Sequence, residues 1–194
     1  SIFSPIDFLL GTHKIVGVNP TIPPVRQAEI ESAITVFEYN SEWVKEIELK
    51  NVEDCFPYKD ATSVTWINVA GLKKDEVEKL CNHFEIHPLL IEDILSIGQR
   101  SKMDDLNGLL FCLLNMLYFN DSQNQMESEQ LSIVLGKNFV LSFQEDSRRD
   151  VFESLRGKLR LTNSKVRQNN ADFLFYSLID LVVDHYFIVM EKLG

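Results

Sequence analysis

Two adjacent carboxylates, Glu92 and Asp93, are well suited by residue type and spacing to bind a divalent cation. They lie near the end of the segment HPLLIEDIL at 87–95, where Pro88 suits the first position of a helix. Both carboxylates therefore lie near the negative end of the predicted helix dipole, which disfavours anions. Solvation by water and binding of a cation would each offset this disadvantage, so both interpretations stay open.

A second acidic group lies on the last apolar segment of the chain. Asp180 and Asp184, together with Ser177 and Glu191, are separated by 3, 4 and 7 residues and so share one face of a helix. Solvated like charges at such spacing repel by only about 0.2–0.5 kcal/mol, which requires no metal. If the face were buried against another chain, a hard cation such as Mg²⁺ or Ca²⁺ would be the natural counterion. The spacing alone favours a solvated stripe.

Other candidate ligands give weaker signals. Glu127 and Glu129 share one face of a predicted strand, where we expect them to be solvated. His83 and His87 are four residues apart, but Pro88 takes His87 out of helical geometry, so the two imidazoles need not converge on zinc. The sequence contains no HExxH, Gly-rich phosphate loop or GxSxG motif, so an enzyme is not the default interpretation.

The composition indicates one sizeable globular domain. The chain has 194 residues, of which 45% are hydrophobic and 25% charged, and its formal net charge is −10. This charge argues against nucleic-acid binding, which needs Lys and Arg at the phosphates, and it suits a chain that attracts cations. Seven of the 19 basic residues lie between Arg148 and Arg167, where we expect a solvated helix and loop. Cys55, Cys81 and Cys112 have apolar neighbours and are expected to be buried, reduced thiols.

The positions of apolar and turn-forming residues divide the chain into an irregular leader at 1–32 and one domain at 33–194. Alternating or continuous apolar runs predict strands at 34–39, 64–69, 109–119, 128–135 and 139–143. Helical spacing and capping residues predict a short helix after Ser41, and further helices from 73, at 88–95, at 150–160 and from 170 to the end. Turns at 120–125 and 136–138 join the last three strands, which predicts that these strands are consecutive and antiparallel.

The last helix must also be tested as a membrane span. Residues 173–190 are apolar apart from Ser177, Asp180, Asp184 and His185. Each Asp near the centre of a span costs about 2.5–3.5 kcal/mol, so a buried helix of a soluble domain is the better interpretation. The helical pattern reaches Gly194 without a cap, and we expect the helix to continue beyond it.

Several motifs occur in an order and at intervals that are familiar. They are TWINVAGL at 65–72, HPLLIEDIL at 87–95, QRSK at 99–102, ESEQLSIVL at 127–135, KNFVLSFQE at 137–145 and ADFLFYSLIDLVVDHYF at 171–187. Together they resemble the N-terminal cytoplasmic domain of the CorA family of Mg²⁺ channels or transporters, over roughly residues 34–194. The resemblance implies an α/β fold with a mixed, largely antiparallel sheet between two layers of helices. It also implies that the C-terminal helix is the start of a long stalk.

The resemblance implies roles for the four carboxylates. Asp93 would face an acidic residue on the stalk helix of a neighbouring subunit, with a divalent cation between them. Glu92 and Asp180 match a second, neighbouring cation site, and Asp184 matches another acidic position of the same helix. The bound ion would be Mg²⁺, with Co²⁺, Ca²⁺ or Zn²⁺ as substitutes. An Asp93 that faced inward and paired with an Arg or Lys of its own chain would contradict this sensor role.

The resemblance also implies an assembly and a location. The full-length protein would be a homopentamer on the cytoplasmic face of the cell membrane, reaching the membrane only through helices that follow Gly194. Cytosolic Mg²⁺ bound between subunits would hold the pentamer closed, and its loss would let the carboxylates repel one another. Ion conduction would reside outside these residues. Because the stalk partner of Asp93 would lie beyond Gly194, the chain alone should bind Mg²⁺ weakly and associate poorly.

Three other functions remain compatible with the sequence. The first is the cytoplasmic domain of a zinc-transporting relative, which would differ in the ion and its coupling. The second is a soluble metal-dependent hydrolase that uses Asp180, Asp184 and Glu92, and it requires these carboxylates to converge in one cleft. The third is an interaction module whose acidic stripe contacts a basic partner without a cation.

Overall fold

The computed structural model describes residues 32–120, 125–148 and 150–193. The predicted leader at 1–32 lies outside the described residues except for Ser32, and the predicted turn at 120–125 lies outside them except for its two ends.

Among the described residues, a seven-stranded mixed sheet forms the centre of the molecule, with the strand order β2-β1-β3-β7-β6-β5-β4. The strands are β1 (Ala33–Tyr39), β2 (Val44–Leu49), β3 (Val64–Ala70), β4 (Lys102–Leu106), β5 (Leu109–Asn120), β6 (Gln125–Leu135) and β7 (Phe139–Gln144). β3 and β7 are parallel, and every other neighbouring pair is antiparallel. The predicted run of three antiparallel strands is confirmed as β5, β6 and β7.

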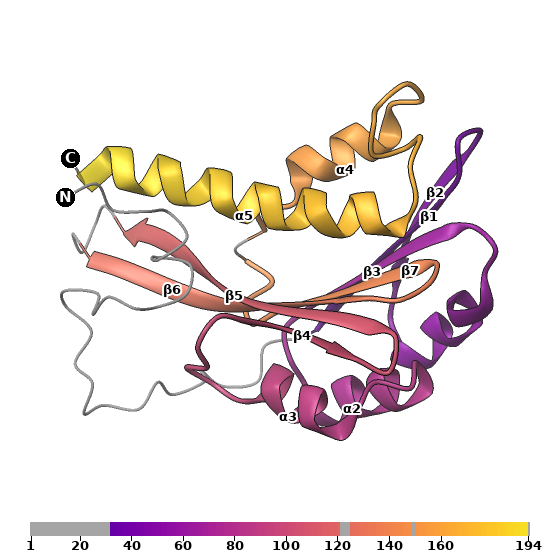
Figure 1. Cartoon of the computed structure of the whole chain (residues 1–194), viewed down its shortest axis with the longest axis horizontal. Coiled ribbons are helices and arrows are strands. Elements are labelled where there is room, and N and C mark those ends of the chain that lie inside the picture. The colour runs from indigo at the N-terminus through magenta and orange to yellow at the C-terminus, as the bar shows by residue number, and fades with distance from the viewer. Residues whose placement is uncertain (1–31, 121–124, 149, 194) are drawn as a thin grey trace.

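Helices cover both faces of this sheet (Figure 1). One layer consists of α4 (Glu153–Arg160) and α5 (Ala171–Leu193), and the other of the 3₁₀ helix η1 (Val52–Asp60), α2 (Lys74–His83) and α3 (Pro88–Leu95). The predicted fold class, a mixed and largely antiparallel sheet between two helix layers, is therefore confirmed.

Each face of the sheet has its own hydrophobic core, because successive strand residues point to opposite sides. Trp66 of β3 packs under α4 and α5, where its ring meets that of Phe152 edge-on at 5.5 Å between centroids. The next residue, Ile67, packs on the side of α2 and α3. β5 contributes to both cores, with Cys112 on one face and Leu113 on the other. It is covered on both sides, as its continuous apolar run predicted.

The helix predicted after Ser41 is wrong, since this segment forms strand β2. Asn40 makes the turn before it, and its side-chain oxygen accepts hydrogen bonds from the backbone N–H groups of Glu42 and Trp43 at 2.8 and 2.9 Å. The strand that follows pairs with β1, with Val44 opposite Tyr39, and its residues are half-buried or exposed. The asparagine turn and cross-strand pairing therefore override the capping signal of the serine.

The basic segment 148–167 is solvated at Arg148, Lys158, Arg160 and Lys165, as its charge predicted, but two of its cations are buried. Arg167 is buried, and its guanidinium donates hydrogen bonds to the backbone oxygens of Asn40, at 2.6 Å, and Leu159, at 2.9 Å. Arg156 is also buried, pairs with Asp150 and lies over the ring of Trp66. These cations hold α4 and the loop after it against the sheet.

α5 has one buried and one exposed side. Leu174, Leu178 and Val182 are fully buried, and α5 lies over β5, β6 and β7. In the described part of the chain, Ala171–Glu191 is the stretch whose length and hydropathy would suffice to cross a membrane, and about a third of it is buried in this structure. Its sheet-facing side accounts for that buried third.

The three cysteines are free and buried, as predicted. Burial raises the pKa of the Cys55 and Cys112 thiols to about 12 and that of Cys81 further still. A thiol in this state is a poor nucleophile and a poor metal ligand. The cysteines therefore act as small core residues.

Candidate cation site

Helix α3 presents the first acidic pair. Pro88 occupies its first position, and the side chain of His87 caps it by accepting a hydrogen bond from the N–H of Leu89 at 3.2 Å. Leu90, Ile91 and Ile94 are buried in the core beneath the helix, and this anchors it to the sheet.

The two histidines have separate structural roles. His87 is the cap of α3, whereas His83 stacks on the ring of Phe56 at 3.9 Å between centroids and lies within hydrogen-bond distance of its carbonyl oxygen. The two rings are therefore engaged with different parts of the chain.

The carboxylate of Asp93 forms a salt bridge with a lysine of its own chain. The Lys102 ammonium at the start of β4 lies 2.5 Å from Asp93 Oδ2, and only 15% of the Asp93 side chain is exposed. Lys102 also lies 3.3 Å from Asp104 Oδ2, and hydrogen bonding to Asp93 raises the pKa of Lys102. This is the arrangement that would contradict the sensor role predicted for Asp93. In this chain, Asp93 is not an open ligand.

The backbone around Asp93 is fixed independently of its carboxylate. The Gln130 side-chain amide on β6 donates hydrogen bonds to the backbone oxygens of Asp93 and Ser96, both at 3.0 Å. These bonds satisfy carbonyl groups at the C-terminal end of α3, which have no partner within the helix. The position of this turn therefore does not depend on Lys102 alone.

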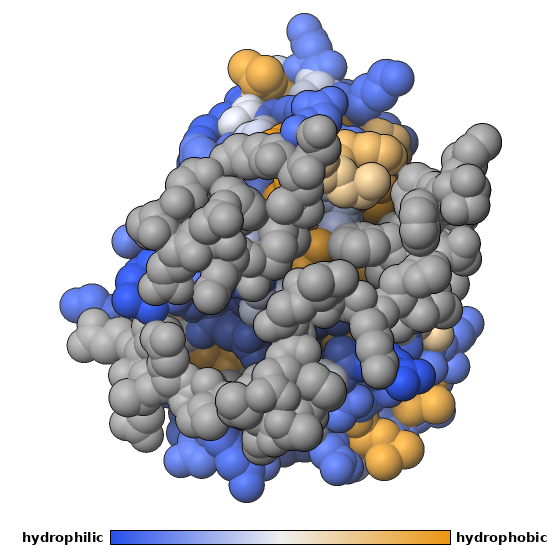
Figure 2. Space-filling view, turned by 90° about the vertical axis from the view of Figure 1, so that its left-hand side faces the viewer, coloured by the Kyte–Doolittle hydropathy of each residue, from blue (hydrophilic) through white to orange (hydrophobic). Residues whose placement is uncertain are grey.

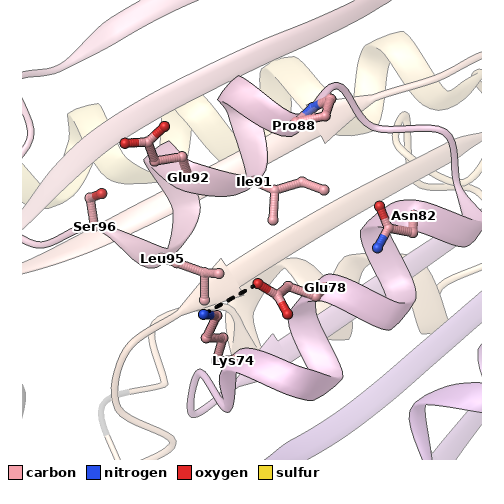
Figure 3. Close-up of a pocket in the computed structure, with 8 residues that line it drawn as sticks. All are labelled: Lys74, Glu78, Asn82, Pro88, Ile91, Glu92, Leu95 and Ser96. Carbon is pink, nitrogen blue, oxygen red and sulfur yellow. Dashed lines mark ion pairs between the residues drawn. The ribbon is translucent and has the colours of Figure 1, made fainter.

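Glu92 is exposed on the outer side of α3. It belongs to the rim of an open groove between α2 and α3, whose floor includes Ile91 and Leu95 (Figure 3). Across the groove, Lys74 pairs with Glu78 at 3.7 Å, and the carboxylate of Glu92 points away from that pair. Glu92 is thus available to a partner outside this chain.

Asp180 and Asp184 are exposed on α5, opposite the buried face of that helix. They lie in the helix layer on the other side of the sheet from Glu92 and Asp93 (Figure 1). One chain therefore does not bring the four predicted ligands together, and the described residues contain no group of three or more His, Cys, Asp or Glu side chains arranged to hold a metal ion. The hydrolase interpretation fails here, because its three carboxylates do not converge in a cleft.

The prediction that the Glu129 side chain is solvated is wrong. The side chain of Glu129 is buried, and it accepts hydrogen bonds from the Tyr118 hydroxyl at 3.1 Å and from the N–H of Asp146 at 2.8 Å. Burial is the main cause that raises its pKa to about 7, with Glu145 and Asp146 adding to the shift. The pairing of β6 with β5 explains the burial, since Glu129 lies opposite Met116 of β5, which is also buried.

Comparison with known proteins shows the family of this chain. The model of the CorA-like Mg²⁺ transporter proteins matches residues 61–194, which is more than half of the chain. The chain belongs to the CorA family. This is a family of transporters rather than enzymes. The cobalt/magnesium transport protein CorA of Thermotoga maritima is 40% identical over 161 residues, which cover 82% of this chain and 46% of that protein. The chain thus spans about half the length of this relative.

Solved structures support the same fold. The soluble domain of CorA from Methanocaldococcus jannaschii matches with a TM-score of 0.59 and 17% identity over 86% of this chain and 62% of that one. The cytoplasmic domain of ZntB from Vibrio parahaemolyticus matches with a TM-score of 0.53 and 11% identity over 84% of this chain and 64% of that one. At these identities the structural matches establish the fold alone.

Proposed function

We propose that this chain is the cytoplasmic, non-enzymatic cation-sensing domain of a CorA-like divalent cation transporter that works as a homo-oligomer, a pentamer in the full-length protein. The observation that carries the proposal is the placement of Glu92 and Asp180 in a CorA-family chain. Both are exposed carboxylates on the outer sides of opposite helix layers. A residue on either outer side can meet a neighbouring subunit, but the two cannot meet within one chain.

The donor set fits half of a divalent-cation site. Mg²⁺ prefers about six oxygen ligands in octahedral geometry and usually keeps several waters, so one or two carboxylates suffice for the protein share. Glu92 of one subunit and Asp180 of the next would supply these oxygens, with Asp184 one helical turn further along. Asp93 would become a further ligand only if the Lys102 ammonium moved away from it.

Cation binding between subunits would regulate transport by shifting a population. A cation that bridges two subunits binds the closed assembly better than the open one and therefore stabilises it. Without the cation, the exposed acids of a chain with net charge −10 repel one another across the interface. Transport of Mg²⁺ would then be limited by cytosolic Mg²⁺ itself.

Flux assays on the full-length protein in vesicles test this function. The double variant Glu92→Gln with Asp180→Asn should raise the Mg²⁺ concentration for half-maximal inhibition, by about tenfold if the pair contributes about 1.4 kcal/mol. Glu48→Gln, which removes an exposed carboxylate from the edge strand β2, is the matched control and should leave this concentration unchanged. Unchanged inhibition in the double variant would refute the proposal.

A zinc-transporting relative is the second candidate, and the fold that this chain shares with the ZntB domain is compatible with it. Flux of Mg²⁺, Co²⁺ and Zn²⁺ through the same vesicles separates the two, since a zinc transporter should carry Zn²⁺ in preference to Mg²⁺. An interaction module that needs no cation would instead associate equally well with and without a chelator.

A further inference from the structure

We propose that Lys102 is a built-in competitor of the divalent cation at Asp93. Its ammonium holds the carboxylate in the cation-free state and must leave before a cation can bind there. This inference rests on the proposed function, because it concerns the regulation of the same site. It explains how Asp93 can belong to a cation site and yet be paired within its own chain.

The contact distances and exposed fractions support competition rather than coexistence. The Lys102 ammonium is 2.5 Å from Asp93 Oδ2, and 15% of the Asp93 side chain is accessible to solvent. A divalent cation needs direct oxygen contacts at about 2.0–2.6 Å, so a cation on this carboxylate would lie within a few ångströms of the ammonium group. Like charges at such short range also repel strongly in a partly buried site.

The structure provides a second position for the displaced ammonium. Asp104, two residues further along β4, lies 3.3 Å from the Lys102 ammonium and is more exposed than Asp93. Lys102 can therefore move toward Asp104 without becoming an unpaired charge. β4 is an edge strand that pairs only with β5 among the described strands, so its outer side has no neighbouring strand to restrict the lysine.

The turn that carries Asp93 would stay in place during this exchange. Gln130 holds the backbone oxygens of Asp93 and Ser96, and Ile94 between them is buried. The exchange therefore needs a rotation of two side chains, and α3 itself need not move. Because the backbone is already in position, less conformational entropy is lost when the cation binds.

Lys102 could compete with the cation or position Asp93 for it, and these two roles predict opposite effects of removing the lysine on cation binding. If Lys102 only positioned Asp93, its removal would weaken cation binding. If it competes, Lys102→Gln should strengthen Mg²⁺ binding to the full-length protein, by about twofold to fivefold, the range expected for the loss of a partly exposed ion pair. Lys102→Arg should restore the wild-type affinity, because the guanidinium keeps the positive charge.

Mg²⁺ titration of the detergent-solubilised full-length protein by calorimetry measures this directly. Lys79→Gln is the matched control, since Lys79 forms a comparable pair with Glu53 at 2.8 Å on a different part of the surface. It should leave Mg²⁺ affinity unchanged. The strengthening by Lys102→Gln should disappear when Asp93→Asn is also present, because the competition acts through that carboxylate.

The outcomes separate this inference from the proposed function. Weaker or unchanged binding in Lys102→Gln overturns the competition, and so does a strengthening that persists with Asp93→Asn. The proposed function is judged independently by Glu92→Gln with Asp180→Asn. A reduction of Mg²⁺ sensitivity there, together with no effect of Lys102→Gln, would keep the sensor and reject the lysine switch.

Discussion

The carboxylates of this chain differ mainly in what surrounds them. Glu92 and Asp180 are solvated, Asp93 is covered by an ammonium group, and Glu129 is buried among neutral and acidic partners. The same functional group is therefore a solvated carboxylate, a salt-bridged carboxylate or a titrating core residue. Residue type alone distinguishes none of these states.

Glu129 should make the stability of the domain depend on pH near neutrality. Its pKa in the folded state is about 7, raised from 4.5, so the folded state binds more protons than the unfolded state between these values. The free energy of unfolding should therefore fall as the pH rises through this window, by at most about 3 kcal/mol. Urea unfolding of the isolated chain at about pH 5 and about pH 8 measures the difference.

Glu129→Gln should remove most of this dependence, because the amide stays neutral at both pH values. Glu48→Gln, at an exposed position, should retain it. An equal pH dependence in wild type and Glu129→Gln would show that another group titrates.

Elements whose residues follow one clear periodicity were predictable from sequence. The segment 88–95 has a proline at its start and a buried face, and the run at 109–119 is apolar without interruption, so α3 and β5 form where expected. Elements that form only by pairing with another strand were not predictable in this way. β2 forms because β1 pairs with it, and β4 forms on the edge of β5 from residues for which no strand was predicted.

The same distinction applies to the candidate site. Glu92, Asp93, Asp180 and Asp184 could be selected as acids on helix faces, but the separation of their two helices by the sheet follows only from the topology. Lys102 was missed because its partner lies nine residues away across a turn that carries no helical or strand periodicity. Only the folded chain brings the two charges together.

Arg167 should be a major contributor to the attachment of the segment that joins α4 to α5. Arg167→Met would leave the backbone oxygens of Asn40 and Leu159 without these donors, and should lower the free energy of unfolding by about 2–3 kcal/mol. Lys165→Met, two residues earlier and exposed, should change it by less than about 0.5 kcal/mol. Denaturant unfolding of both variants measures the difference, and equal stabilities would show that the buried guanidinium is not structural.

The whole molecule presents acids outward on both helix layers, while its cores are closed against the sheet. On the side shown in Figure 2, the visible described residues are mostly hydrophilic and the apolar ones form small separate groups. A net charge of −10 makes copies of the chain repel one another unless cations intervene.

The isolated chain should therefore bind Mg²⁺ weakly and remain monomeric or poorly associated. Each chain offers only half of the proposed site, and Lys102 occupies Asp93. Calorimetric titration with Mg²⁺ and sedimentation analysis with and without Mg²⁺ test this expectation. Tight stoichiometric binding that is lost in Asp93→Ala would show that the acidic residue that shares the cation with Asp93 lies within this chain.

The central claim is that divalent cations bind between subunits at these exposed acids. Its most direct test is an anomalous difference map of the full-length assembly crystallised with Mn²⁺ or Co²⁺. The account predicts a peak at each subunit interface, between Glu92 of one subunit and Asp180 of its neighbour. Peaks confined to single subunits, or an interface without any peak at saturating cation, would contradict it.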